Sequence, residues 1–138
     1  MPKFSFTIHG NHKSNTGNPV PYTRVTQGTK FTDKAMSYAS WKEHVKGSFL
    51  AYCVDQKYLN HKDFKALLYA LPDMKPIVKS KKKCHMSIMI TFVDDTHGDS
   101  DNVFKGIADA LFQNDKYLSG SFDYQYGEKG KVDIVIEM

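Results

Sequence analysis

Cysteine is scarce in this sequence, with only Cys53 and Cys84 among 138 residues. A disulfide-stapled secreted domain or a zinc site needs more cysteines, or cysteines at closer spacing. Apolar runs are also short, and none approaches the roughly 20 residues that a helix needs to cross a bilayer. We therefore expect two reduced, buried thiols and no membrane span.

The amino terminus lacks the apolar stretch of a secretory signal, which needs about 7 to 15 consecutive apolar residues. Residues 3–9 instead alternate between apolar and polar side chains, which is typical of a half-buried strand. We expect a cytoplasmic protein.

Several catalytic signatures are missing as well. The sequence contains neither of the two common glycine-rich phosphate-binding motifs. It also contains no motif of a serine or cysteine nucleophile. Its six histidines are scattered, and only His97, beside an acidic run, is a candidate to contact a phosphate. A calcium loop starting at Asp95 is excluded, because Ser100 stands where that loop requires glycine.

The composition itself is that of one soluble globular domain spanning residues 1–138, with 41% hydrophobic and 25% charged residues. The net charge of +4 is modest, but five lysines gather in one short segment. Such a cluster would suit a phosphate backbone, and a solvated loop explains it equally well. Its members are Lys75, Lys79, Lys81, Lys82 and Lys83.

Hydrophobic periodicity predicts an α+β fold with one mixed sheet of about four strands and helices mainly on one face. Thr32 can cap the first helix, and Pro72 stops a shorter one. The turn Gly127 to Gly130 indicates a hairpin between the last two strands. The predicted strands are 3–9, 83–93, 117–126 and 131–137, and the predicted helices are 33–56, 64–71 and 100–112, with a long loop over 10–30.

An acidic run, Gly98 to Asn102, lies between a predicted strand and the helix that follows it. Asp99 and Asp101 could share a hard cation such as Mg²⁺, which prefers oxygen ligands. Lys105, one turn further on, could offset the charge on a metal-bound phosphate. Asp115 is the natural third carboxylate, and Asp109 would support the site or pair with Lys105.

Capping offers a simpler explanation of the same residues. An aspartate at a helix start is favoured by the exposed amides and the helix dipole. Asp101 with Lys105 would then be an ordinary surface ion pair. Spacing alone favours this explanation over a metal site.

The acidic run and its helix also match a known signature. DSDNVFK over residues 99–105 and DAL over residues 109–111, followed by Asn114 and Asp115, resemble the RusA family of phage and bacterial Holliday junction resolvases. That family's pattern is DxDNxxK, then an apolar helix ending in DAL, then an acidic pair. Residues 8–10 and 18–24 are more loosely similar to the family's first strand and proline-basic segment.

The resemblance implies a Mg²⁺-dependent endonuclease, with Mn²⁺ as a substitute, that acts in DNA recombination and repair. It implies a homodimer that resolves four-way junctions by paired symmetric nicks. The metal ligands would be Asp99, Asp101 and Asp115, and the catalytic lysine would be Lys105. Backbone contacts to DNA would come from Arg24, Lys79, Lys81, Lys82 and Lys83.

The chain departs from the family's pattern in two places. Asn114 replaces one member of the acidic pair, so Asp123 or Asp95 could serve as the third ligand. Residues 55–77 form a longer insertion than the family's pattern leads us to expect. Two other functions stay open: a non-catalytic DNA-binding protein on the same fold, and a nuclease for flaps or forks.

Overall fold

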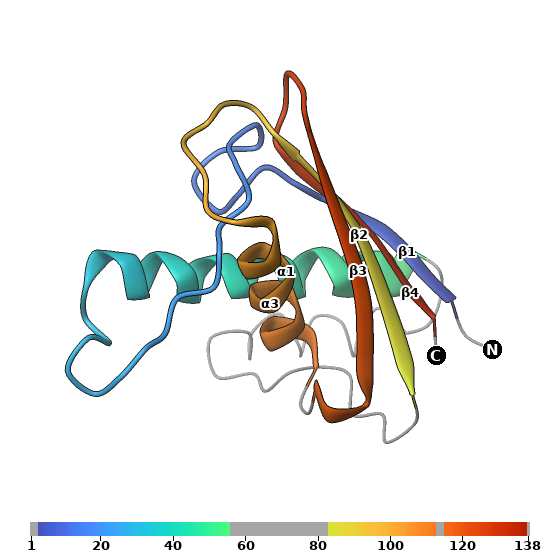
Figure 1. The fold of residues 1–138 in the computed structure, drawn as a ribbon, viewed down its shortest axis with the longest axis horizontal. Helices are drawn as coiled ribbons and strands as arrows, with labels where there is room; N and C mark the ends of the chain where they lie inside the picture. The colour runs from blue at the N-terminus through green and yellow to red at the C-terminus, as the bar shows by residue number, and fades with distance from the viewer. Residues whose placement is uncertain (1–2, 56–82, 113–114, 138) are drawn as a thin grey trace.

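The structure, a computed structural model, describes residues 3–55, 83–112 and 115–137. In these ranges the chain forms a single mixed sheet of four strands with two α-helices, as predicted (Figure 1). The elements are β1 (Lys3–His9), α1 (Asp33–Asp55), β2 (Cys84–Phe92), α3 (Ser100–Leu111), the short 3-10 helix η2 (Asp115–Tyr117), β3 (Leu118–Tyr126) and β4 (Lys131–Glu137). The predicted helix over 64–71 lies outside the described residues.

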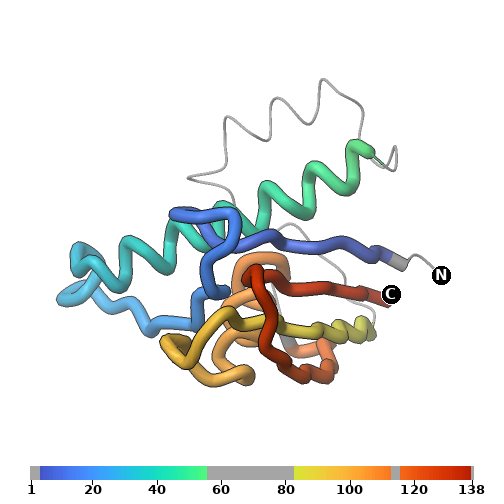
Figure 2. Tube along the Cα trace, turned by 90° about the horizontal axis from the view of Figure 1, so that it is seen from above, coloured from blue at the N-terminus to red at the C-terminus, as the bar shows by residue number. Residues whose placement is uncertain are grey.

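The strands lie in the order β1-β4-β2-β3. β4 is antiparallel to both of its neighbours, while β2 and β3 are parallel and α3 connects them. A parallel pair requires such a crossover, because the chain must return to the end of the sheet at which the first strand began before the second strand can start. The start of β1 and the end of β4 consequently lie side by side (Figure 2).

The predicted hairpin between the last two strands is wrong, because β2 separates β3 from β4. The turn after β3 passes the end of β2, where the Gly127 N–H donates to the Phe92 carbonyl at 2.9 Å. Val132, Ile134 and Ile136 are buried along β4, which favours a place inside the sheet. β3, exposed over most of its length, forms the edge.

The glycines of this turn also differ from the expectation that they supply hairpin conformations. Among the described glycines, positive φ occurs only at Gly10, at 58°. Gly130 is required for another reason: a Cβ there would lie 1.9 Å from the carbonyl oxygen of Gly17. It permits a close approach between the turn and the loop that follows β1.

Both described helices pack on one face of the sheet (Figure 1). The Thr32 hydroxyl accepts the Ala35 N–H at 3.2 Å, which confirms the predicted cap of α1. The core joins three elements: α1, α3 and the apolar face of the sheet. Its largest fully buried side chains include Trp41, Tyr38, Phe92, Ile8, Met86 and Ile107.

Cys53 and Cys84 are both buried thiols, as expected. Burial raises the pKa of Cys53 from 9.0 to about 11. None of the helices that the structure describes is long and apolar enough to cross a membrane.

Three connections meet at one end of the sheet. The register pairs His9 with Lys131 and Phe92 with Tyr126, so β1, β2 and β3 end where β4 begins. The loop after β1, the loop from β2 to α3 and the turn after β3 therefore lie together, and the acidic run is part of this end.

Candidate functional site

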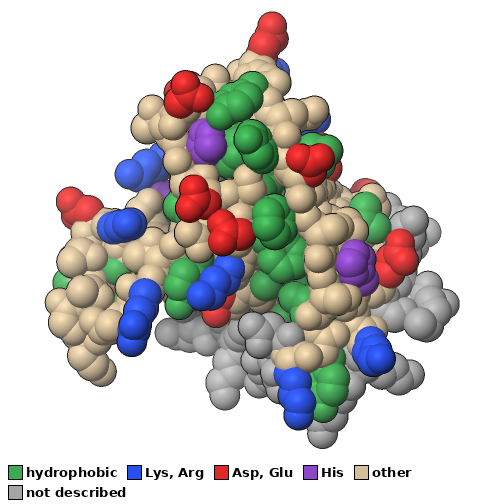
Figure 3. Space-filling view, viewed as in Figure 1, with side chains coloured by type: hydrophobic (Ala, Val, Ile, Leu, Met, Phe, Trp, Pro, Cys, Tyr) green, Lys and Arg blue, Asp and Glu red, His purple; other side chains and the backbone are tan. Residues whose placement is uncertain are grey.

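The acidic run begins α3. Asp99 is the residue before the helix, with an extended backbone at φ −69° and ψ 147°, and its carbonyl accepts the N–H groups of Asn102 and Val103 at 3.1 Å. Asp101 lies in the first turn, and both carboxylates are exposed. Figure 3 shows acidic side chains gathered around this end of α3. The sequence therefore places two carboxylates at a helix N-terminus, as predicted.

Neither carboxylate has the partner that the capping explanation requires. The Asp99 side chain makes no cap hydrogen bond. Asp101 forms no ion pair with Lys105, whose Nζ instead lies 4.2 Å from the centre of the Tyr22 ring. Two carboxylates at this end of α3 are thus available to a ligand, although the helix dipole favours them even without one.

The segment that carries Tyr22 is held against α3. The Tyr22 N–H donates to the Asn102 carbonyl at 2.8 Å, and the Tyr22 ring lies edge-on to Tyr38 at 5.5 Å. Gly106 allows this approach, since a Cβ there would lie 3.3 Å from the Tyr22 nitrogen. Arg24 follows two residues later and is exposed. The predicted DNA-contacting residue Arg24 therefore lies two residues after the contact between Tyr22 and α3.

Asp109 has partners other than the predicted Lys105. The Tyr38 hydroxyl donates to the Asp109 carboxylate at 2.7 Å, and Lys42 forms an ion pair with it at 3.4 Å. Burial, followed by this hydrogen bond, raises the pKa of Tyr38 above its usual value. Asp109 therefore links α3 to α1, and the expectation that it pairs with Lys105 is corrected.

The loop between β2 and α3 is fixed by Asn18. Its side-chain amide donates to the Asp94 carboxylate at 2.9 Å and to the Thr96 carbonyl at 3.0 Å, and its oxygen accepts the Val93 N–H at 2.7 Å. An open pocket of about 600 Å³ lies beside these contacts. It is lined by Asn11, Gly17, Asn18, Pro19, Val20, Pro21, Val93, Asp94, Thr96, His97 and Gly98.

His97 is held inside this loop. Its ring stacks on Phe92 with centroids 3.6 Å apart and planes 5° apart. Its Nδ1 lies 2.7 Å from the Gly98 carbonyl, and its Nε2 lies 3.0 Å from the Tyr126 hydroxyl. A carbonyl only accepts, so Nδ1 carries a proton, and Nε2 shares its hydrogen bond with the Tyr126 hydroxyl. His97 therefore orients the loop that leads to Asp99.

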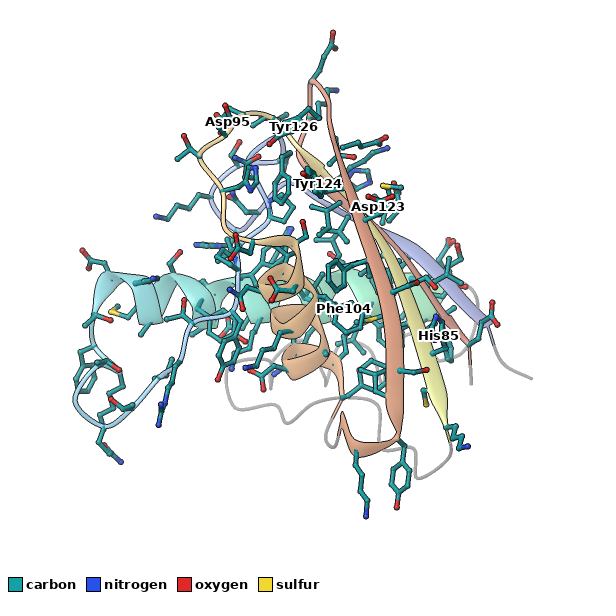
Figure 4. The ribbon with its side chains drawn as sticks, in the orientation of Figure 1. His85, Asp95, Phe104, Asp123, Tyr124 and Tyr126 are labelled. Carbon is teal, nitrogen blue, oxygen red and sulfur yellow. The ribbon has the colours of Figure 1, made fainter. Side chains whose placement is uncertain are left out.

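The third carboxylate is not brought to the acidic run by the backbone of Asp115. α3 is roughly 18 Å long at 1.5 Å per residue, and η2 begins with Asp115 beyond its far end. The side chain of Asp115 lies outside what the structure describes. Of the alternatives, Asp123 points away from α3, whereas Asp95 lies in the loop beside Tyr126 (Figure 4).

No complete metal site is assembled from the side chains described in residues 3–55, 83–112 and 115–137. They contain no group of three histidines, cysteines, aspartates or glutamates that could hold an ion. The donors at the acidic run are thus the carboxylates of Asp99 and Asp101.

The lysine cluster contributes only one described member. Lys83 is exposed just before β2, at the opposite end of that strand from the acidic run. Lys75, Lys79, Lys81 and Lys82 lie outside the described residues.

Sequence reasoning missed an exposed aromatic stripe on β3. Phe122, Tyr124 and Tyr126 are 46%, 52% and 53% exposed. Their alternation with polar residues predicts a strand but not its exposure, because an edge strand and a half-buried inner strand show the same period.

No protein-family model matches the chain, and a search of curated proteins found no match either.

Proposed function

We propose that this chain is a Mg²⁺-dependent endonuclease that resolves four-way DNA junctions by paired symmetric nicks. One observation carries the proposal: Asp99 and Asp101 are exposed at the start of α3 with no hydrogen-bond or ion-pair partner for their side chains among the described residues, and Lys105 follows Asp101 by one turn. The resemblance of DSDNVFK and DAL to the RusA signature supports it.

The donor set fits Mg²⁺, which keeps several waters and is often bound through one or two carboxylates plus substrate phosphate. The ion, or Mn²⁺ in its place, would supply a nucleophilic water and polarise the scissile phosphate. Two exposed carboxylates that have no side-chain partner in the described part of the chain suit this role, because no described hydrogen bond or ion pair must break before they bind the ion.

Lys105 would stabilise the charge that develops on the phosphate during cleavage. Its ammonium lies over the Tyr22 ring, a contact that holds it without neutralising it, unlike a carboxylate partner. Arg24, on the same segment as Tyr22, would contact the DNA backbone without reading sequence. Lys79, Lys81, Lys82 and Lys83 keep the same proposed role.

The third ligand has two candidates. The resemblance assigns it to Asp115, whereas the fold brings Asp95 to the same end of α3 as Asp99. Asp95→Asn and Asp115→Asn, compared in one cleavage assay, identify the ligand, because only the variant that loses the ligand should require more Mg²⁺. A homodimer is part of the proposal, since two opposing strands need two sites.

The test is cleavage of a labelled four-way junction by the purified protein in Mg²⁺, with EDTA as the control. We expect nicks at symmetric positions on opposing strands in Mg²⁺ and no cleavage in EDTA. Binding of the junction with every strand left intact would instead make the chain a non-catalytic DNA-binding protein. Linear duplex, flaps and forks of matched sequence are assayed in parallel, and faster cleavage of flaps or forks would redirect the same chemistry to those substrates.

A further inference from the structure

The exposed aromatic side chains of β3 lie on the face of the sheet that α3 covers. Phe122, Tyr124 and Tyr126 occupy alternate positions, and Phe122 contacts Phe104 of α3 with ring centroids 5.9 Å apart. In Figure 3 hydrophobic side chains form a band over β3 beside α3. We call these three residues the aromatic stripe. A contiguous exposed patch of this kind marks an interaction site more often than an isolated apolar residue does.

The two tyrosines of the stripe are held in place from beneath. Both rings pack against the ring of Phe92, which is fully buried. The ring centroids are 6.1 Å apart for Tyr124 and 6.3 Å apart for Tyr126. The two rings lie edge-on to each other, with centroids 6.1 Å apart and planes at 89°, and the Tyr126 hydroxyl is hydrogen-bonded to His97 Nε2 at 3.0 Å. Because these rings are already held in place, the tyrosine side chains lose little conformational entropy when a ligand stacks on them, which favours binding.

The stripe adjoins the candidate active site. Tyr126 contacts His97, which precedes Asp99 by two residues. In Figure 4 Tyr124 and Tyr126 point to the side of the sheet where the loop with Asp95 lies, and Asp123 of the same strand points to the opposite side. A molecule bound at Asp99 and Asp101 therefore has the tyrosines within its neighbourhood.

The chemistry of the surroundings indicates what would cover the tyrosines. A carboxylate borders them, since Asp95 lies in the loop beside Tyr126 (Figure 4). Phosphates would be repelled there, whereas a nucleobase is uncharged and presents a π-face that stacks on any aromatic ring. An unpaired base fits, with its phosphate directed towards a cation held at Asp99 and Asp101.

We propose that Tyr124 and Tyr126 form a stacking platform for an unpaired nucleobase of the DNA substrate, next to the carboxylates of α3. The inference rests on the proposed function and deepens it, because it predicts that the enzyme selects DNA in which bases are unstacked. A fully paired duplex would offer no base to the platform.

The experiment compares Tyr124→Ser with Tyr124→Phe, which keeps the ring and loses only the hydroxyl. Tyr117→Ser is the matched control, since Tyr117 is also an exposed tyrosine but precedes the opposite end of β3. The probe is a four-way junction with a single 2-aminopurine at the branch point, with Ca²⁺ in place of Mg²⁺ so that binding is measured without cleavage. Anisotropy gives the affinity, and 2-aminopurine quenching reports stacking.

We expect Tyr124→Ser to weaken junction binding by about fivefold or more, the range of one base–aromatic contact, and to lose most of the quenching. Tyr124→Phe and Tyr117→Ser should both stay close to the unmodified protein. Circular dichroism of each variant checks that the fold is kept, and retained quenching in a folded Tyr124→Ser would overturn the inference.

Two other outcomes separate this inference from the proposed function. A protein that cleaves junctions but binds them equally well with and without the Tyr124 ring keeps its function and loses the stacking platform. A protein that binds no DNA fails as a nuclease at all. Sedimentation velocity is run on the same samples, and a dimer that Tyr124→Ser alone converts to monomers would overturn the platform by making the stripe an interface between copies.

Discussion

Helix α3 carries aspartates in two different settings. Asp109, near its end, accepts a hydrogen bond from Tyr38 and pairs with Lys42, so its charge is used to join α3 to α1. Within residues 3–55, 83–112 and 115–137, the side chain of Asp101, two turns earlier on the same helix, has no such partner, and neither has that of Asp99. The same residue type therefore serves packing at one end of the helix and is available to a ligand at the other.

Two lysines near these aspartates, Lys42 on α1 and Lys105 on α3, show the same contrast. Lys42 Nζ forms an ion pair with the Asp109 carboxylate at 3.4 Å. Lys105 forms no ion pair with Asp101, and its Nζ lies over the Tyr22 ring instead. An ammonium that is not neutralised by the protein keeps its full charge for a phosphate. Four predictions test this division, from the largest expected effect to the smallest.

Asp101→Asn should lower junction cleavage by roughly a thousandfold, because a metal ion contributes several kcal/mol to such a transition state. DNA binding should be kept or strengthened, since repulsion of phosphate falls. Rates and affinities are measured on the same junction. Asp109→Asn is the matched control and should retain most of its cleavage, and unchanged turnover in Asp101→Asn would return Asp101 to a role at the helix start.

Lys105→Met should reduce the cleavage rate by roughly 100-fold, the cost of removing one group that stabilises transition-state charge. The unbranched side chain keeps most of its length, so its packing beside Tyr22 is largely retained. Single-turnover kinetics at saturating protein separate this effect from weaker binding. Lys42→Met removes an equivalent charge beside Asp109, and an equal rate loss there would erase the contrast between the two lysines.

Tyr38→Phe should lower the free energy of unfolding by about 1 kcal/mol or more, because it deletes a hydrogen bond to a carboxylate. Its effect on cleavage should be small, as the bond joins α1 and α3 at Asp109. Urea unfolding followed by circular dichroism measures the change. A variant with unaltered stability but lost cleavage would place Asp109 in the active site instead.

The pH dependence of stability offers the finest test. Burial and the bond to Asp109 raise the pKa of Tyr38, so the folded protein holds this proton where the unfolded chain has lost it. The stabilisation is therefore fully present below the ordinary tyrosine pKa of about 10 and is lost as the pH rises above it. The free energy of unfolding, measured from pH 8 to about 11, should fall more steeply with pH in the unmodified protein than in Tyr38→Phe. Parallel curves would contradict the coupling between the Tyr38 proton and folding. Cys53 contributes equally to both curves and cancels.

Most of the elements could be predicted from the sequence. The strand over residues 84–92 and the helix over 100–111 were each predicted to within a residue at either end, because alternation and helical spacing are local properties of the chain. The cap at Thr32 was likewise local. The predicted hairpin between the last two strands is wrong. Two consecutive strands joined by a short turn normally pair, but strand pairing also depends on which surfaces are buried in the folded protein.

The amino-acid sequence by itself determined the identity of the elements, the acidic run at the start of a helix and its likeness to a nuclease signature. Tertiary structure alone decided the insertion of β2 between β3 and β4, the pairing of Asp109 with Tyr38 and the position of Lys105 on Tyr22. It also decided that an aromatic face of β3 stays exposed beside the carboxylates. The reason is physical: periodicity is written in neighbouring residues, whereas partners and exposure depend on segments that are distant in the chain and meet only when the core is packed.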